Sequence, residues 1–362
     1  MTTTVAPRRR ATFHPLKVAA IDAITDDSVA ITFAVPRELA GEYEFTAGQH
    51  LTIRRRGEEI RRSYSICSPA DSGVLRIGVK RIPGGEFSAY AANDLKAGDE
   101  LEVMTPLGRF GTTFDAANAK HYAFVAAGSG ITPVLSLVAT VLSIEPSSRV
   151  TLLYGNRTAG SVMFADELAD LKDRYTERFH LVHVLSRETT EVELFSGRID
   201  AGRLQRMFAT ILPLDSVDEW FLCGPYTMVV SAQDLLLAEG VAREHVHAEL
   251  FHVGDEAPKA PVEESTADED AAQVTVILDG RRSTFALGEH SKAVLDATLA
   301  VRSDAPFACK GGVCGTCRAK VLDGNVRMDT NWALEPDEIR AGYVLTCQSH
   351  PTTPQVTLDF DA

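Results

Sequence analysis

The pattern of apolar and polar residues divides the chain into regions of different character. Up to about residue 117, apolar and polar residues alternate in short segments such as 29–35, 50–54 and 75–80, and Gly, Pro and Asp separate these segments. Short alternating strands with such turns are typical of an antiparallel β-barrel. We therefore expect a barrel over residues 15–117, preceded by a flexible polar tail at 1–14 without the apolar core of a secretion signal.

From residue 118 the apolar runs become continuous. Buried strands are expected at 122–127, 150–154, 179–185 and 220–223. Helical patterns are expected after the first, second and fourth of these strands, at 133–144, 165–174 and 228–239. Alternating strands and helices predict an α/β domain over 118–253, with a parallel sheet covered by helices on both faces.

A second change of composition separates a C-terminal region. Residues 254–272 are rich in acids, Pro, Ala and Ser, and Val262 is their only large apolar residue. Such a segment cannot bury a core, so it is predicted to be a mobile acidic linker, with a solvated charged loop as the alternative. The region 273–362 combines a strand, a helix and a hairpin-like piece at 319–326, which predicts a small α+β domain.

Four of the six cysteines lie in this last region. Cys309, Cys314 and Cys317 form the spacing C-x4-C-x2-C, and Cys347 follows after 29 further residues. This is the pattern of plant-type ferredoxins, whose thiolates hold a [2Fe–2S] cluster. A zinc site or a set of unrelated thiols is the alternative, but structural zinc usually takes two close C-x2-C pairs and only one is present.

Charge and cysteine usage narrow the functional classes. The chain has 36 Lys and Arg against 50 Asp and Glu, a formal net charge of −14. This disfavours nucleic acid, whose phosphates attract basic surfaces, and is compatible with a protein partner that has a basic patch. No apolar stretch reaches the ~18 residues of a membrane span. The cysteine content is typical of a reducing compartment, so we expect a cytoplasmic protein.

Two motifs in the predicted barrel have the chemistry of a cofactor site. In Arg62-Ser63-Tyr64-Ser65, the guanidinium can hold a phosphate and the ring can stack on another ring, although this tetrapeptide also occurs in ordinary strands. The glycines at 84–85 precede an expected helix start near Ser88, where free N–H groups can bind a pyrophosphate. A plain hairpin turn is the alternative there.

The α/β region adds further candidates at the ends of its predicted strands. The segment 128–133, GSGITP, joins a buried strand to a helix, the usual place for a dinucleotide phosphate. The segment 223–228, CGPYTM, follows another strand, although a lone Cys there is often a core residue. Arg157 and Arg187 follow two successive strands and could hold a ribose 2′-phosphate, which favours NADPH; solvated loop arginines are the alternative.

The order of these motifs resembles the ferredoxin–NADP⁺ reductase superfamily. With a ferredoxin domain at the C-terminal end, the chain resembles the reductase components of multicomponent oxygenases. FHPL at 13–16, RRSYSIC at 61–67 and HAELF at 247–251 are most similar to the reductase subunits of phenylacetyl-CoA epoxidases. The resemblance implies electron transfer from NADPH, with NADH less expected, through FAD and a [2Fe–2S] cluster to the oxygenase subunits of a multicomponent monooxygenase.

The resemblance also assigns roles to individual residues. The catalytic candidates are Ser65, Cys223 and Glu249. The expected cofactor-binding residues are Arg62, Ser63, Tyr64, Ser65, Val79, Lys80, Gly85, Phe87, Ser88, Gly128, Gly130, Thr132, Pro133, Asn156, Arg157, Ser186, Arg187, Cys223, Gly224, Met228 and Phe251. The expected metal ligands are Cys309, Cys314, Cys317 and Cys347. Because the chain continues past Phe251, that ring is not C-terminal as it is in plant-type reductases.

Two other functions are compatible with the same residues. A reductase that serves a Rieske-type oxygenase, such as a ketosteroid 9α-hydroxylase, has the same cofactors and differs only in its partner. A redox-sensing or metal-binding adaptor would need the cluster but no turnover. Reduction of cytochrome c by NADPH distinguishes an enzyme from an adaptor, and the identity of the partner distinguishes the two reductases.

Overall fold

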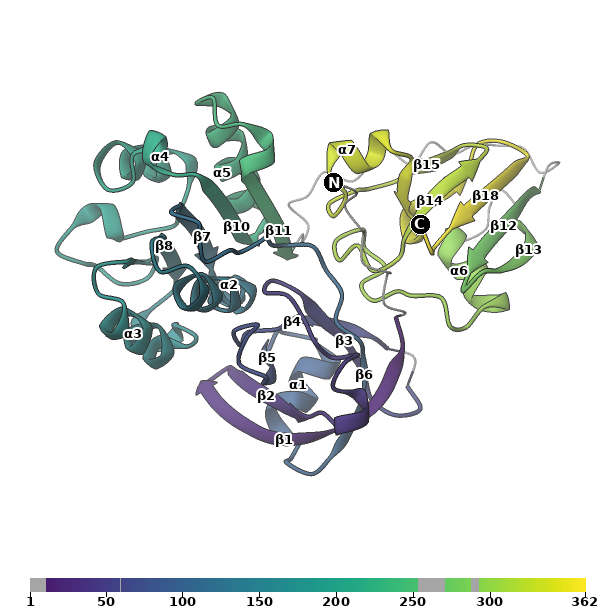
Figure 1. Ribbon diagram of the computed structural model, residues 1–362, viewed down its shortest axis with the longest axis horizontal. Helices are drawn as coiled ribbons and strands as arrows, with labels where there is room; N and C mark the ends of the chain where they lie inside the picture. Colours follow the sequence, from purple (N-terminus) through teal and green to yellow (C-terminus); the bar gives the residue numbers. More distant parts are fainter. Residues whose placement is uncertain (1–10, 59, 253–270, 288–292) are drawn as a thin grey trace. The chain divides into compact units, whose positions relative to one another are not determined.

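The computed structural model describes residues 11–58, 60–252, 271–287 and 293–362 (Figure 1). The predicted tail lies outside the described residues up to residue 10, and its last two residues already belong to a strand. The predicted linker also lies outside them, except for its last two residues. The chain divides into a larger unit, Phe13–Ile60 with Tyr64–Ala257, and a smaller unit that contains Pro258–Ala362.

The first domain is a six-stranded antiparallel sheet in the order β4-β3-β6-β1-β2-β5. Its strands are β1 Phe13–Thr25, β2 Ser28–Ala34, β3 His50–Arg54, β4 Arg62–Ser65, β5 Leu75–Lys80 and β6 Glu100–Met104. An isolated bridge between Ile66 and Ile77 joins the two outer strands of this order. The sheet therefore closes on itself, which confirms the predicted barrel and removes exposed strand edges. Helix α1, Glu86–Asn93, packs against β5.

The second domain is a five-stranded parallel sheet in the order β11-β10-β7-β8-β9. Its strands are β7 His121–Ala127, β8 Arg149–Asn156, β9 Phe179–Leu185, β10 Glu219–Pro225 and β11 Val246–His252. Helices α2 Ile131–Ile144 and α3 Ala165–Arg174 cover one face, and α4 Ala201–Thr210 and α5 Tyr226–Ala238 cover the other (Figure 1). The parallel sheet with helices on both faces is therefore confirmed.

Two elements of this domain were not predicted from the pattern, α4 and β11. Strand β11 is an edge strand, paired only with β10 among the described residues; only its Val246 and Leu250 are buried, and it does not form a continuous apolar run. Helix α4 is short and amphipathic, and its buried side includes Arg203, whose guanidinium donates to backbone carbonyl oxygens. Its apolar residues were not recognised as a helical pattern between the two longer apolar runs.

The strand order creates the place where a ligand can bind. From β7 the chain proceeds outward through β8 and β9, then returns to the other side of β7 with β10 and β11. The connections leaving β7 and β10 therefore diverge at the carboxyl end of the sheet. Such a switch point is where open α/β sheets bind their ligands.

Helix α2 connects this domain to the barrel. Twelve of its fourteen residues are buried, because one side faces the sheet and another faces the barrel. The Ser136 hydroxyl donates to the Ser68 carbonyl oxygen at 2.7 Å, and Thr140 Oγ1 accepts from the Ala70 N–H at 3.0 Å. The two domains of the larger unit thus share a packed, hydrogen-bonded interface.

The smaller unit is a mixed sheet in the order β13-β12-β18-β14-β16, with a separate pair β15-β17. Its strands are β12 Ala272–Leu278, β13 Arg281–Leu287, β14 Arg318–Asp323, β15 Val326–Met328, β16 Tyr343–Leu345, β17 Ser349–Pro351 and β18 Gln355–Asp359. Helices α6 Val294–Val301 and α7 Pro336–Arg340 complete it. The α+β character is confirmed.

The predicted hairpin at 319–326 is wrong. Strand β14 pairs with β16 and β18, whereas Val326 begins β15, which pairs with β17. The cause lies at Gly324, where φ is +76° and a Cβ would lie 2.1 Å from the Gln355 carbonyl oxygen. This close approach of a distant backbone diverts the chain out of one sheet and into the other.

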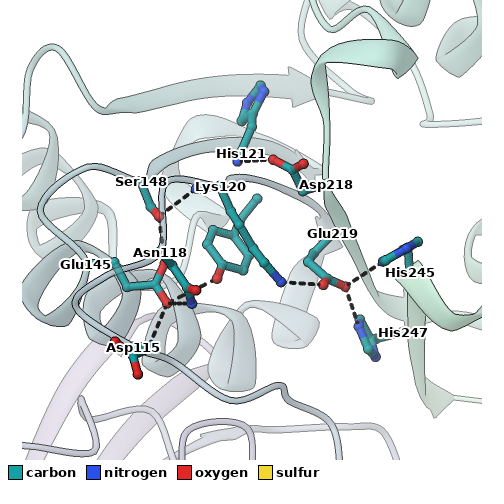
Figure 2. A network of polar contacts seen from close by, with 11 residues as sticks. Asp115, Asn118, Lys120, His121, Glu145, Ser148, Asp218, Glu219, His245 and His247 are labelled. Atoms are coloured by element: carbon teal, nitrogen blue, oxygen red, sulfur yellow. Dashed lines mark hydrogen bonds and ion pairs between the residues drawn. The ribbon is translucent and has the colours of Figure 1, made fainter.

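A polar network lies where the parallel strands begin, at the edge opposite the switch point (Figure 2). Glu219, the first residue of β10, has a side chain that is only 7% exposed. Its carboxylate lies 2.8 Å from Lys120 Nζ, 3.1 Å from His247 Nε2 and 3.5 Å from His245 Nδ1. Burial alone would raise the pKa of Glu219, but hydrogen bonds with His247 and Lys120 outweigh it and bring the pKa to about 2.

The same network anchors the connection from the barrel. Glu145, at the end of α2, is fully buried. Its Oε1 accepts from the Asp115 N–H at 3.0 Å, Asn118 Nδ2 at 2.7 Å and the Tyr122 hydroxyl at 3.1 Å. The segment that joins β6 to β7 is therefore tied to the end of α2 (Figure 2).

We predict that Glu219→Gln lowers stability in a pH-dependent way. A depressed carboxyl pKa stabilises the folded state above the unfolded pKa of ~4.3, and this contribution is lost as pH falls toward 2. The variant should therefore be less stable at pH 7, by on the order of 3 kcal/mol, and the difference should close between pH ~4.5 and ~2. Denaturant unfolding followed by tryptophan fluorescence measures it, since Trp220 is fully buried beside Glu219.

Glu239→Gln, at an exposed position after α5, is the matched control and should change nothing. A stability difference that stays constant from pH 7 to pH 3 would contradict the linkage.

Candidate functional site

The two loops at the switch point meet backbone to backbone. A Cβ on Gly130 would lie 2.3 Å from the Cys223 carbonyl oxygen, so only glycine fits at this position. Gly224 has a φ of +155°, and a Cβ added to it would likewise come too close to the Met228 methyl carbon and the Ala127 nitrogen. Six of the predicted residues are therefore brought together here, namely Gly128, Gly130, Thr132, Cys223, Gly224 and Met228.

The conformation of the first loop is held from both sides. Gly128 has φ of +54°, and its carbonyl oxygen accepts from the Tyr154 hydroxyl at 3.0 Å. The Thr132 hydroxyl donates to the Ser129 carbonyl oxygen at 3.0 Å, and Pro133 occupies the first turn of α2, where no N–H is needed. Sequence reasoning missed Tyr154, because a tyrosine inside an apolar strand gives no sign that its hydroxyl reaches a loop.

The three catalytic candidates converge from three strands. Cys223 on β10 is paired in register with Glu249 on β11, and a hydrogen bond connects Glu249 with Ser65 at the end of β4. Burial raises the pKa of the Cys223 thiol, and the nearby Glu249 charge raises it further. At neutral pH Cys223 is therefore an uncharged thiol, which makes it a poor nucleophile but a small neighbour for a flat ring.

Glu249 has the properties of a proton-holding group. Burial raises its pKa to about 8, and the hydrogen bond with Ser65 acts in the opposite direction. Its Oε2 is shielded from solvent and has no hydrogen-bond partner among the described residues. A protonated carboxyl near neutral pH can donate a hydrogen bond or a proton to a group placed beside it. Glu249 Oε2, without a hydrogen-bond partner among the described residues, lies on the strand beside the uncharged Cys223 thiol. A flavin or nicotinamide ring fits such a site.

The barrel contributes two aromatic rings and a turn that contains Gly85. The rings of Tyr64 and Phe87 lie with centroids 5.5 Å apart, which places β4 beside the start of α1. A Cβ on Gly85 would lie 2.4 Å from Ser88 Oγ. Ser88 Oγ itself donates to the Gly85 carbonyl oxygen at 3.1 Å and accepts from the Ile82 N–H at 3.3 Å. Ser88 is buried, so its visible role is to hold this turn.

The remaining barrel candidates lie on two strands. Arg62 is exposed and Ser63 half-buried at the start of β4. Val79 is buried in β5, and the neighbouring Lys80 Nζ lies 3.4 Å from Asp27 Oδ1. Lys80 is therefore paired with a carboxylate, and its contact with a cofactor stays a prediction.

The two arginines that were proposed to bind a 2′-phosphate lie side by side. The Arg187 N–H donates to the Arg157 carbonyl oxygen at 2.8 Å, and the Ser186 N–H donates to the Asn156 carbonyl oxygen at the same distance. Both arginines are exposed, and within the described part of the chain neither guanidinium has an ion pair. Asn156 Nδ2 is buried without a hydrogen-bond partner among the described residues. Phe251, near the end of β11, packs half-buried against the core of this unit.

In the smaller unit the four cysteines form two pairs of thiols. A hydrogen bond with Cys314 lowers the pKa of Cys309 to about 5, and one with Cys317 lowers the pKa of Cys347. The Gly311 N–H also points at Cys309 Sγ, at 3.3 Å. Within the described residues, no three or more His, Cys, Asp or Glu side chains gather as the ligands of one metal ion. Two pairs of thiols are the donor set of a cluster with two irons.

The ligand loop has the backbone that such a site requires. Lys310, Gly312 and Gly315 all have positive φ, at +52°, +73° and +66°. Left-handed conformations at these three positions turn the chain so that three thiols from one loop can face the fourth, on Cys347. The residues present therefore fit a [2Fe–2S] cluster.

Along the described chain, no helix is both long and apolar enough to cross a membrane.

Comparisons with known proteins identify the class. Three families match the chain in order: the oxidoreductase FAD-binding domain over residues 15–111, the oxidoreductase NAD-binding domain over 124–234, and the 2Fe-2S iron-sulfur cluster binding domain over 276–352. Phthalate dioxygenase reductase, a solved structure, has the same fold, with a TM-score of 0.58 and 23% identity over 96% of this chain and 98% of that one.

Two relatives are similar over almost their full length. A 1,2-phenylacetyl-CoA epoxidase subunit from Escherichia coli K12 is 46% identical over 97% of this chain and 98% of its own. The ferredoxin reductase component of 3-ketosteroid-9-alpha-monooxygenase from Rhodococcus rhodochrous is 36% identical over 95% and 96%. The chain therefore belongs to the family of flavin and iron–sulfur reductase components of oxygenases. It is an oxidoreductase with FAD, nicotinamide and [2Fe–2S] as cofactors and an oxygenase as partner, as the sequence predicted.

We predict that Gly130→Ala destabilises the larger unit and weakens nucleotide binding. The new methyl group would meet the backbone of Cys223, which cannot move without distorting β10, at a cost of about 1–3 kcal/mol. Thermal unfolding and calorimetric titration with NADP⁺ measure the two effects. Gly160→Ala is the control, because no atom lies within 4 Å of its new methyl group. Equal behaviour of the two variants would contradict the close approach.

We predict that Cys314→Ser loses bound iron and keeps its flavin. The thiol belongs to the smaller unit, whereas the candidate flavin residues from Tyr64 onward lie in the larger one. Iron, sulfide and flavin analysis measures this, and NADPH-dependent ferricyanide reduction should persist. Cys67→Ala, which removes a buried thiol of the barrel, should retain its iron. Full iron content in Cys314→Ser would remove this residue from the ligand set.

Proposed function

We propose that this protein transfers electrons from NADPH to the oxygenase component of a phenylacetyl-CoA epoxidase, in phenylacetate catabolism. The observation that carries the proposal is the 46% identity with the Escherichia coli epoxidase subunit over nearly the whole of both chains. The ketosteroid reductase component, at 36% over a similar length, supports the alternative partner, a Rieske-type oxygenase. Both relatives act with an oxygenase, so the partner's class is common to the two proposals.

A bound flavin would accept a hydride and release single electrons, which a nicotinamide and an iron–sulfur cluster cannot exchange directly. For this task the chain supplies a shielded, protonated acid at Glu249 and an uncharged thiol at Cys223. The Ser65 hydroxyl, hydrogen-bonded with Glu249, orients that acid. The glycine loop at Gly130 lets the nucleotide approach the same edge. We assign the flavin and nicotinamide to the space around these groups.

We also propose the domain boundaries 15–117, 118–253 and 273–362, with 254–272 as a linker. The three families that match the chain fall within these limits and support them. None of the six cysteines, all of which lie in the described residues, forms a disulfide, which suits a reducing compartment, and we place the protein in the cytoplasm.

We predict a preference for NADPH over NADH that depends on Arg157 and Arg187. The backbone hydrogen bond between their segments brings the two positions next to each other, and we infer that both exposed side chains reach one 2′-phosphate. Replacing both by Met should weaken NADPH binding by about 1.5–3 kcal/mol for each lost charged contact and leave NADH unchanged. Steady-state KM values for both nucleotides measure this.

Arg174→Met, at the exposed end of α3, is the control for lost charge alone. Equal KM values for NADPH and NADH in the unmodified enzyme would rule out the preference.

Reconstitution with the oxygenase tests the proposed partner. We expect the protein, mixed with phenylacetyl-CoA epoxidase oxygenase, oxygen, NADPH and phenylacetyl-CoA, to consume NADPH in step with epoxide formation. Because the chain carries a net charge of −14, the rate should fall as salt screens docking to a basic patch. Failure to form epoxide, with efficient reduction of a ketosteroid hydroxylase oxygenase, would transfer the assignment to the Rieske alternative.

A further inference from the structure

One polar side chain of the smaller unit contacts both parts of the cysteine site. Gln348 directly follows Cys347, the fourth candidate ligand. Its Nε2 donates to the carbonyl oxygens of Lys310 at 2.9 Å and Cys347 at 3.0 Å, and it lies 3.6 Å from Cys347 Sγ. Lys310 belongs to the loop that carries the other three candidate ligands. One amide nitrogen therefore connects the two segments that the site needs to bring together.

The orientation of this amide follows from its neighbours. Nε2 faces two carbonyl oxygens, which can only accept, so the nitrogen must be on that side. On the other side, the Thr330 hydroxyl donates to Gln348 Oε1 at 2.7 Å. The backbone is held as well, since the Asp329 N–H donates to the Gln348 carbonyl oxygen at 2.8 Å. The Gln348 side chain is thus fixed at both ends.

The ligand loop also packs directly on this side chain. A Cβ on Gly312 would lie 3.1 Å from both Gln348 Cγ and Thr330 Oγ1. The Trp332 N–H donates to the Gly312 carbonyl oxygen at 3.0 Å, which holds the loop in that position. The loop has therefore little room to shift relative to Gln348 while these contacts persist.

We propose that Gln348 is a positioning residue of the iron–sulfur site, which, together with the Thr346 hydrogen bonds to the Cys317 carbonyl oxygen, fixes the separation of the two ligand segments and directs an N–H group at Cys347 Sγ. The inference rests on the proposed assignment of the four cysteines to one [2Fe–2S] cluster. A reduced cluster carries one more negative charge, and hydrogen bonds to its sulfurs favour that state. Loss of the donor should therefore both loosen the site and make reduction less favourable.

Gln348→Met tests the proposal, because methionine has a similar length and no amide. We expect a chelator to remove iron several-fold faster than from the unmodified protein. We also expect the equilibrium constant for reduction to fall about tenfold, equivalent to 59 mV for one electron. Gln348→Glu keeps an acceptor for Thr330 but places a carboxylate near Cys347, so its reduction should be less favourable still. Redox titration monitored by electron paramagnetic resonance measures the shift in the full-length protein.

Two further variants complete the experiment. Thr330→Val removes the hydroxyl that orients Gln348 but leaves the donor, so a smaller shift in the same direction is expected. Gln355→Met changes an exposed glutamine on β18 and should alter neither quantity. Unchanged potential and unchanged iron release in Gln348→Met would overturn the inference.

If Gln348→Met holds no iron at all, Thr330→Val decides. A shifted potential or faster iron release in that variant supports the inference, and no change in either overturns it. Iron analysis of the unmodified protein distinguishes failure of the proposed cluster from failure of the proposed role of Gln348. A protein without iron would contradict the proposed cluster, and this inference with it, whereas an iron-loaded protein with unaltered variants would contradict this inference alone.

Discussion

The close approach of two backbones organises the larger unit. Residue 130 lies so near the Cys223 carbonyl that only a hydrogen atom fits between them, and this brings the connection after β7 against the connection after β10. Helix α2 begins at that point, and its outer side packs on the barrel through Ser136 and Thr140. The glycine contact fixes where α2 begins, and α2 packs the sheet domain against the barrel, to which the Arg76–Glu167 ion pair adds a further contact.

This packing explains why the catalytic candidates have unusual chemistry. Glu249 belongs to the parallel sheet and Ser65 to the barrel, so their hydrogen bond forms only when the two domains are together. The same assembly removes Glu249 Oε2 from solvent, which raises the carboxyl pKa to about 8. At the opposite edge of the sheet, Glu219 faces Lys120 and forms a hydrogen bond with His247, and its pKa falls to about 2. Burial raises the pKa of both carboxyls, but only at Glu219 do hydrogen bonds and the charge of Lys120 outweigh it.

In the smaller unit, the proposed cluster site requires four thiols from separate positions in the sequence to lie close together. Three come from one loop, where the left-handed conformation of Lys310 and of two glycines turns the chain. The fourth, Cys347, comes from a distant segment that is attached to that loop through Thr346, which donates to the Cys317 carbonyl oxygen, and through Gln348, which donates to the Lys310 carbonyl oxygen. Residues that are not candidate ligands therefore hold the two segments of the proposed site together.

The sequence by itself determined the three-part architecture, most strand and helix positions, and the iron–sulfur character of the last domain. The apolar–polar periodicity and the spacing of the cysteines are properties of the sequence itself, so they can be recognised without the tertiary structure. It did not determine edge strand β11, the partners of β14, or the contacts of Tyr154 and Gln348. Nor did it show that Glu249 would be protonated and Glu219 charged. Strand pairing and carboxyl pKa depend on which distant residues become neighbours and on how completely water is excluded, and only the tertiary structure decides both.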